Sequence, residues 1–266
     1  MCEFRKVSKA TLWLFAVVAT MGSLRATPAC ATSDDWQDCS GTQIYSTSQT
    51  LKYNWRAGRD EPCFRLLNGV NLDLAGHTIE CPPENAPCVA AVVASATGSA
   101  VVDGEIVGRF VVAIENPERV TKLRISGADT AVAGQSVKKI DDSIFLDCKA
   151  CVRVNLVSAL ARIVNNFFRP AADSTGLGGT AVSASSSVSS GSSPQVERNY
   201  TTGHCGGFES PGGGLVRFTR NVVGPMSSTV TSECFEFAED GGESYSGNLC
   251  SDSGKCPDPV LPFVLP

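Results

Sequence analysis

The sequence predicts an all-β fold, a single-stranded parallel β-helix (solenoid) that occupies residues 64–249. Two observations lead to this prediction. Short β segments recur along the chain, often followed by Gly, Asn or Asp, and long amphipathic helical stretches are almost absent. Only 18% of the 266 residues are charged, and 25 are glycines. This composition is typical of a β-rich domain with many tight turns.

The first 31 residues predict a signal peptide. Arg5, Lys6 and Lys9 precede an apolar run from Thr11 to Met21, and Ala29-Cys30-Ala31 fits a cleavage site. The alternative is a lipoprotein with lipid on Cys30, but the usual Leu before the Cys is missing. The apolar run is short for a bilayer span, and no later segment is long and apolar enough. We therefore expect a secreted, extracellular or periplasmic protein with no membrane span in the mature chain.

The mature chain is predicted to be acidic. Beyond residue 31 it keeps 18 basic and 26 acidic residues, a net charge of −8. Such a charge opposes binding to nucleic acid or to an anionic membrane. We therefore expect neither as a partner.

Cysteine usage supports the same compartment. Ten cysteines follow residue 31, and an even number in an exported chain indicates a disulfide framework. The sequence leaves their connectivity open, and sequential pairing is the working hypothesis. The Cys148–Cys151 spacing also fits a redox motif or half a zinc site, but no second such pair and no nearby His accompany it. The predicted disulfide cysteines are Cys39, Cys63, Cys81, Cys88, Cys148, Cys151, Cys205, Cys234, Cys250 and Cys256.

Internal repetition is the main argument for a solenoid. Ile125, Ile144 and Ile163 are spaced by 19 residues each, and other intervals run from about 20 to the low thirties. Turns of such a fold stack about 4.8 Å apart and share a column of aliphatic side chains. The predicted strands are Val70–Leu74, Ala100–Val102, Lys122–Ser126, Ser143–Leu146, Ala161–Val164, Gln195–Arg198 and Leu215–Thr219.

Alternation within the strands predicts which side chains face the interior. In Leu123-Arg124-Ile125, Ala161-Arg162-Ile163 and Val216-Arg217-Phe218, the apolar residues would point inward and each arginine outward. A β-sandwich also has short alternating strands and is the alternative fold. Asparagines that follow strands favour the solenoid, because their amides can bond one turn to the next. The asparagines expected to stack in this way are Asn165, Asn166, Asn199, Asn221 and Asn248.

The N-terminal region carries a family resemblance. The segments Cys39-Ser-Gly-Thr-Gln-Ile44 and Gly69-Val-Asn-Leu-Asp-Leu-Ala-Gly-His-Thr-Ile79 resemble the opening of right-handed parallel β-helix repeat proteins, the pectate-lyase-like superfamily. The motif covers about forty residues. The resemblance implies a right-handed solenoid with an N-terminal cap at residues 32–63. We expect Trp36 and Trp55 to cover that end, and residues 250–266 to form a C-terminal tail.

The same resemblance implies a carbohydrate-related role. Polysaccharide lyases with this fold hold calcium with carboxylates and use an Arg or Lys as base. The nearest acidic run, Glu236 to Glu243, looks like a solvated turn, so calcium is a candidate without a clear ligand cluster and no metal ligand is predicted. Other cofactors and any catalytic residue stay unknown.

One outward column of side chains is the candidate substrate-binding site. Stacked arginines repel one another unless an anion lies between them, and a uronate chain could bind them through its carboxylates. The alternative is a solvated face of mixed charge. The candidate binding residues are Arg124, Arg162, Arg217 and Glu197. The full predicted column is Asp73, Asp103, Arg124, Ser143, Arg162, Glu197 and Arg217.

Two functions follow from these expectations. The first is a secreted β-helix that binds or cleaves an acidic polysaccharide; if it is an enzyme, it would be a polysaccharide lyase or a related carbohydrate-active enzyme. The second is a non-catalytic extracellular or cell-surface scaffold with a structural or adhesive role. Aromatic residues make up only 7% of the chain, which counts against a sugar-binding groove and makes the second function a close alternative. Asn199-Tyr-Thr201 is also a sequon for N-glycosylation in a eukaryotic secretory pathway.

Overall fold

The structure is a computed structural model in which residues 33–266 form one compact unit. The predicted signal peptide, residues 1–31, lies outside the described residues, as does the predicted tail after residue 250. The described residues are 36–95, 98–135, 137–156, 158, 160–171, 179–187, 193–203, 208–209, 216–226, 244–246 and 248–250.

The described part of the chain consists of 25 short strands and one 3₁₀ turn, η3 (Pro83–Asn85). The strands are β1 (Trp36–Asp38), β2 (Gln43–Tyr45), β3 (Gln49–Thr50), β4 (Asn54–Arg56), β5 (Phe64–Leu66), β6 (Asn71–Asp73), β7 (Thr78–Cys81), β8 (Cys88–Ala94), β9 (Ala100–Gly108), β10 (Phe110–Glu115), β11 (Arg119–Ser126), β12 (Thr130–Gly134), β13 (Lys139–Asp141), β14 (Ile144–Leu146), β15 (Ala150–Leu156), β16 (Arg162–Val164), β17 (Phe167–Arg169), β18 (Thr180–Ser186), β19 (Gln195–Glu197), β20 (Tyr200–Gly203), β21 (Phe208–Glu209), β22 (Arg217–Thr219), β23 (Val222–Met226), β24 (Ser244–Ser246) and β25 (Leu249–Cys250).

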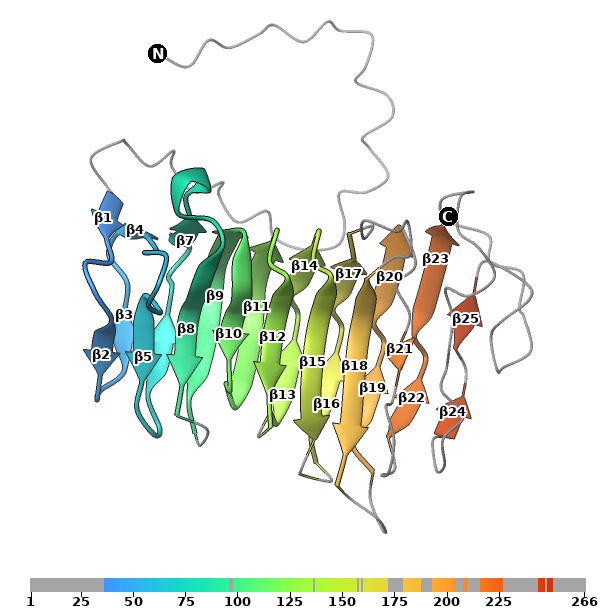
Figure 1. Cartoon of the computed structure of the whole chain (residues 1–266). Helices are drawn as coiled ribbons and strands as arrows, with labels where there is room; N and C mark the ends of the chain where they lie inside the picture. Colours follow the sequence, from blue (N-terminus) through green and yellow to red (C-terminus); the bar gives the residue numbers. More distant parts are fainter. Residues whose placement is uncertain are drawn as a thin grey trace, which may run out of the picture. The chain divides into compact units, whose positions relative to one another are not determined.

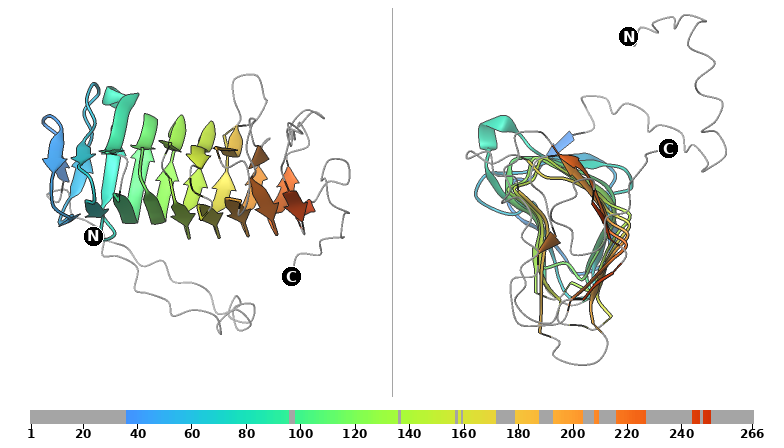
Figure 2. Two further views of the ribbon diagram at one scale, coloured as in Figure 1. Left: turned by 90° about the horizontal axis from the view of Figure 1, so that it is seen from below. Right: turned by 90° about the vertical axis from the view of Figure 1, so that its right-hand side faces the viewer.

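These strands form two parallel sheets, one of 17 strands and one of eight. Most turns contribute three strands, whereas the turns that contain β9 and β11 contribute two, because each of these long strands covers both halves of the large sheet. For example, β13, β14 and β15 pair in parallel with β16, β17 and β18 of the next turn. Figure 1 shows successive turns side by side in chain order, and the right view of Figure 2 looks along the stack. This connectivity confirms an all-β parallel fold and is compatible with a β-helix. It excludes the two facing antiparallel sheets of the alternative β-sandwich.

The interior is filled by columns of apolar side chains that run from turn to turn along the sheets. The predicted alternation is confirmed, because Leu123, Ile125, Ile163 and Phe218 are buried while the intervening arginines are exposed. Parallel pairing places equivalent residues of successive turns directly on one another. One column contains Val101, Val120, Ile140, Ile163, Val196 and Phe218. A second contains Ile79, Ile106, Ile125, Phe145 and Phe168.

The 19-residue spacing of the three isoleucines does not give the register. Ile125 pairs with Phe145, and Ile163 pairs with Ile140 in another column. Ile144 therefore points outward and is 39% exposed. A shift of one residue moves a side chain to the opposite face of a strand, which is why the predicted column fails at Ile144.

A sharp corner joins the two halves of each turn within the large sheet. Its residues adopt the left-handed backbone conformation, with φ of 50–56°, although none is glycine. Such a conformation costs an L-residue about 1 kcal/mol or more, so the surroundings must hold it in place. The corner residues are Asp103, Lys122, Asp142, Asn165, Arg198 and Arg220.

An asparagine ladder follows that corner and holds it. The backbone N–H of Asn166 donates to Asn199 Oδ1 at 3.0 Å, and the N–H of Asn199 donates to Asn221 Oδ1 at 3.1 Å. Asn221 continues the ladder to Asn248 at 2.8 Å. The side chains of these four residues are buried, as the sequence predicts for stacked asparagines. Asn165 is the exception, because it occupies the exposed corner position itself.

The N-terminal residues already take part in the stack. Trp36 of β1 pairs with Asn54, and Trp55 of β4 pairs with Ile79 of β7. The Trp55 ring packs edge-on against Phe64 at 5.1 Å between ring centroids. Residues 36–63 therefore extend both sheets towards this end of the unit.

Three cysteine pairs lie at disulfide-bonding distance: Cys39–Cys63, Cys81–Cys88 and Cys148–Cys151. They are consecutive along the chain, as sequential pairing predicts. Cys148 and Cys151 have the spacing of a redox motif, but both are fully buried and have no solvent access. The side chains of the remaining four, Cys205, Cys234, Cys250 and Cys256, lie outside the described residues.

The Glu118 side chain connects its own turn to the turn before it and the turn after it. Its carboxylate accepts the backbone N–H of Gly98 at 2.7 Å and pairs with Lys138 Nζ at 3.1 Å. Burial alone would raise the pKa of Glu118, but the hydrogen bond from Gly98 and the charges of Lys138 and Arg119 outweigh it. The pKa of Glu118 is therefore lowered from its ordinary value of 4.5.

Candidate functional site

The structure separates the residues of the predicted arginine column. Arg162 and Arg217 do share one column, with Gln195 between them. Arg124 lies beyond the corner, where it pairs with Ile144 and Glu105 in register. The predicted single column is therefore corrected, because the corner residue of each turn divides the outward positions into separate columns.

The other members of the predicted column are dispersed as well. Glu197 lies on the strand of Gln195, in the adjacent outward column beside Thr219 and Val164. Asp103 occupies the corner, and Ser143 is buried behind it, where its hydroxyl accepts the N–H of Leu123 at 3.1 Å.

In place of the predicted set, the register builds a basic column on the large sheet. Arg119 pairs with Lys139, Lys139 with Arg162, Arg162 with Gln195, and Gln195 with Arg217. The four cations are exposed. Steps of about 4.8 Å separate neighbours, and Gln195 places Arg217 about 10 Å from Arg162. We call Arg119, Lys139, Arg162, Gln195 and Arg217 the basic column.

Three of the four cations make no ion pair within the described residues, although Arg119 acts on Glu118 from a longer distance. Lys139 Nζ pairs with Asp141 at 2.7 Å. Arg119, Arg162 and Arg217 have no carboxylate of a described residue within the 4.0 Å of an ion pair. Two like charges about 5 Å apart repel by about 1 kcal/mol even in water. An anion laid along the column would relieve this repulsion.

The two other predicted binding residues are already paired. Arg124 Nε lies 2.9 Å from Glu105 Oε1. Glu197 lies 3.5 Å from Arg198 Nε and 3.7 Å from Arg220 Nη1, both of which occupy the corner. Glu197 forms no ion pair with Arg162 or Arg217, so it does not neutralise the basic column.

Sequence reasoning missed Arg119 and Lys139, although a signal for them exists. In each turn the basic or polar residue directly precedes the buried aliphatic or aromatic residue of one core column. The pairs are Arg119-Val120, Lys139-Ile140, Arg162-Ile163, Gln195-Val196 and Arg217-Phe218.

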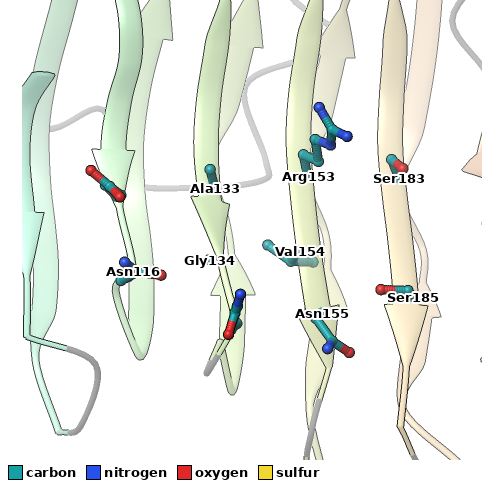
Figure 3. Close-up of a pocket in the computed structure, with 10 residues that line it drawn as sticks. Asn116, Ala133, Gly134, Arg153, Val154, Asn155, Ser183 and Ser185 are labelled. Atoms are coloured by element: carbon teal, nitrogen blue, oxygen red, sulfur yellow. The ribbon is translucent and has the colours of Figure 1, made fainter. Parts of the chain in front are cut away.

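A groove lies on the outer face of the eight-stranded sheet. It has a volume of about 710 Å³ and is crossed by β10, β12, β15 and β18. Figure 3 shows Arg153 and Asn155 on one strand, with Ser183 and Ser185 on the next. Ala133 and Gly134 contribute almost no side-chain bulk, which opens the space between the larger residues. The lining residues are Glu115, Asn116, Ala133, Gly134, Gln135, Arg153, Val154, Asn155, Ser183 and Ser185.

The described residues contain no group of three or more His, Cys, Asp or Glu side chains that could hold a metal ion. The acidic run from Glu236 to Glu243, named above as the nearest calcium candidate, has no described side chain. Among the helices of the described residues, none has the length and apolar character that crossing a membrane requires.

The glycosylation sequon at Asn199 is a rung of the asparagine ladder. Its Nδ2 donates to the carbonyl oxygen of Ile163 at 2.9 Å and to Asn221 Oδ1 at 3.0 Å. The residue is 1% exposed. A glycan on this nitrogen would break the ladder, so the folded chain has no acceptor there.

No protein-family model, curated protein or solved structure matches the chain.

Proposed function

We propose that this protein is an exported, right-handed parallel β-helix that binds an acidic polysaccharide along its basic column. The column of Arg119, Lys139, Arg162 and Arg217, three of them without an ion pair among the described residues, is the single observation that carries the proposal. Export is supported by the N-terminal sequence and by the three cysteine pairs.

An acidic polysaccharide matches the column better than an isolated anion does. The cations repeat along a straight line, and a polymer of uronates repeats its carboxylates along its own axis. Arginine binds carboxylates through two parallel N–H donors, which favours carboxylate over a diffuse counter-ion. Gln195 can donate to a sugar hydroxyl where the column lacks a charge.

Binding without cleavage is the form of the proposal that the described residues favour. Proton abstraction next to a uronate carboxylate needs a base beside groups that stabilise the developing negative charge. An arginine of the column could serve as that base, but the described residues contain no acidic cluster that would hold calcium at the uronate, and the nearest acids, Asp141 and Glu197, are already bonded to cations of their own turns or of the next one.

The test measures the affinity of the mature chain for polygalacturonate, alginate and heparin at low salt. The double variant Arg162→Gln/Arg217→Gln removes two charges from the basic column. The matched control is Arg124→Gln/Arg169→Gln, which removes two charges that are paired with Glu105 and Asp147.

We expect the column variant to bind at least one polymer about tenfold more weakly, since each exposed ionic contact contributes up to about 1 kcal/mol. The control should change the affinity less than twofold. Equal weakening by both doubles, or no binding of the unmodified chain to any polymer, would overturn the proposal. A rise in ultraviolet absorbance from unsaturated uronates would show cleavage and make the protein a lyase.

A non-catalytic scaffold is the second candidate, and the ion pairs elsewhere on the surface favour it. Asp129 bridges Arg109 and Lys149 at 3.8 and 2.9 Å, and Arg56 pairs with Glu80 at 3.9 Å. A surface whose charges are mutually paired has little to offer a charged ligand. Failure of all three polymers to bind would favour this second function.

A further inference from the structure

The groove on the eight-stranded sheet carries opposite charges that do not meet. Glu115, Ala133 and Arg153 occupy one outward column of β10, β12 and β15. Two strand steps separate Glu115 from Arg153, about 10 Å between their Cα atoms. Among the described residues, neither side chain has an ion-pair or hydrogen-bond partner.

The space between these charges is open and polar. Ala133 lies between Glu115 and Arg153 and is too small to fill the gap. On β18 the next residue of the column is Ser183, and Ser185 lies two residues further along the same strand. Figure 3 shows both serines on the strand beside Arg153 and Asn155. The groove thus offers hydroxyl groups beside Arg153, on the side away from Glu115.

One hydrogen-bond acceptor among the lining residues has no donor. Asn155 Oδ1 is buried and has no hydrogen-bond partner. A buried acceptor without a donor costs about 1–3 kcal/mol. Asn155 lines the groove two residues beyond Arg153 on β15, but its Oδ1 is enclosed, so a ligand N–H could pair with it only if the side chain turned towards the groove.

We infer that this groove binds a short zwitterionic peptide, with its ammonium group at Glu115 and its carboxylate at Arg153. An extended chain spans about 3.3–3.6 Å per residue, so three residues bridge about 10 Å. A polymer with charges of one sign would meet repulsion at one end of the groove.

The site is independent of the basic column, which belongs to the other sheet. The peptide proposal can therefore fail while polysaccharide binding holds, and the reverse is also possible.

The test uses ligand-observed NMR on the mature chain with triglycine, N-acetyl-triglycine and triglycine amide as probes. We expect triglycine to bind and each blocked form to bind at least tenfold more weakly, because each block removes one of the two end charges. Glu115→Gln and Arg153→Gln should each weaken triglycine binding by a similar factor. Circular dichroism of each variant checks that it is folded.

Arg65→Gln is the matched control. Arg65 lies in the same outward column, also two steps from Glu115, but on the side away from the groove. It should bind triglycine as the unmodified chain does. No binding of triglycine at millimolar concentration, equal binding of the blocked peptides, or an equal loss in the Arg65 variant would overturn the inference.

Discussion

Replacement of Asn199 by Ala should remove one rung of the asparagine ladder and strongly destabilise the fold. The Asn199 side chain accepts the backbone N–H of Asn166 at 3.0 Å and donates to the carbonyl oxygen of Ile163 at 2.9 Å. Both backbone groups are enclosed by the stacked turns and would lose these partners. Each buried group left without a partner costs about 1–3 kcal/mol, so we expect a loss of about 4 kcal/mol.

The assay is urea unfolding of the mature chain, followed by circular dichroism. The control is Asn165→Gly at the neighbouring corner, where φ is 56° and glycine adopts the conformation without strain. The Asn165 side chain makes one long hydrogen bond, at 3.4 Å to Asp142, and glycine keeps the backbone N–H, so this change should cost less than about 1 kcal/mol. A loss for Asn199→Ala below about 1 kcal/mol, or equal to that of the control, would refute the reasoning.

A second readout follows from the sequon at the same residue. If the chain is expressed in a eukaryotic secretory pathway, the folded, secreted product should carry no glycan at Asn199, because its amide nitrogen is buried and bonded. Mass spectrometry before and after treatment with a peptide N-glycosidase measures this. A homogeneous glycosylated product with native stability would contradict the burial of Asn199.

Three further perturbations test other parts of the structure. Since the pKa of Glu118 is lowered on folding, its stabilisation is present above the ordinary pKa and is lost as the pH falls through the folded value. Glu118→Gln should thus be less stable than the unmodified chain at pH 7, and in urea unfolding the difference should shrink as the pH falls below the ordinary pKa and vanish below the folded one. Gly104→Ala should cost about 1–3 kcal/mol in the same assay, since its Cβ would overlap the Leu74 side chain. Removal of the Cys39–Cys63 pair by double serine substitution should cost about 3 kcal/mol, as expected for a loop of this length; equal stability with and without reductant would argue against the bond.

Local pattern was enough to predict several features of the fold. Alternation correctly placed Arg124, Arg162 and Arg217 outside and their apolar neighbours inside. This works because the side chains of a strand alternate between its two faces whatever the strand pairs with. Asparagines after strands likewise predicted the ladder, since Asn166 and Asn199 satisfy backbone groups of adjacent turns.

The register between turns could not be predicted in the same way. Successive members of the basic column are separated by loops of different length: Arg162 follows Lys139 by 23 residues, but Gln195 follows Arg162 by 33, so no fixed period connects them. The corner residue also adds one position between two outward columns, which moved Arg124 away from Arg162. The groove depends on pairing along the other sheet, and no local pattern connects Glu115 with Arg153.

The register of the large sheet is tested most directly by the distance between Arg119 and Arg217. Nitroxide labels at these two positions, measured by double electron–electron resonance, should give a separation near 19 Å, four strand steps of about 4.8 Å along one straight column. A broad distribution or a separation beyond about 30 Å would contradict the stacking from which the basic column is built.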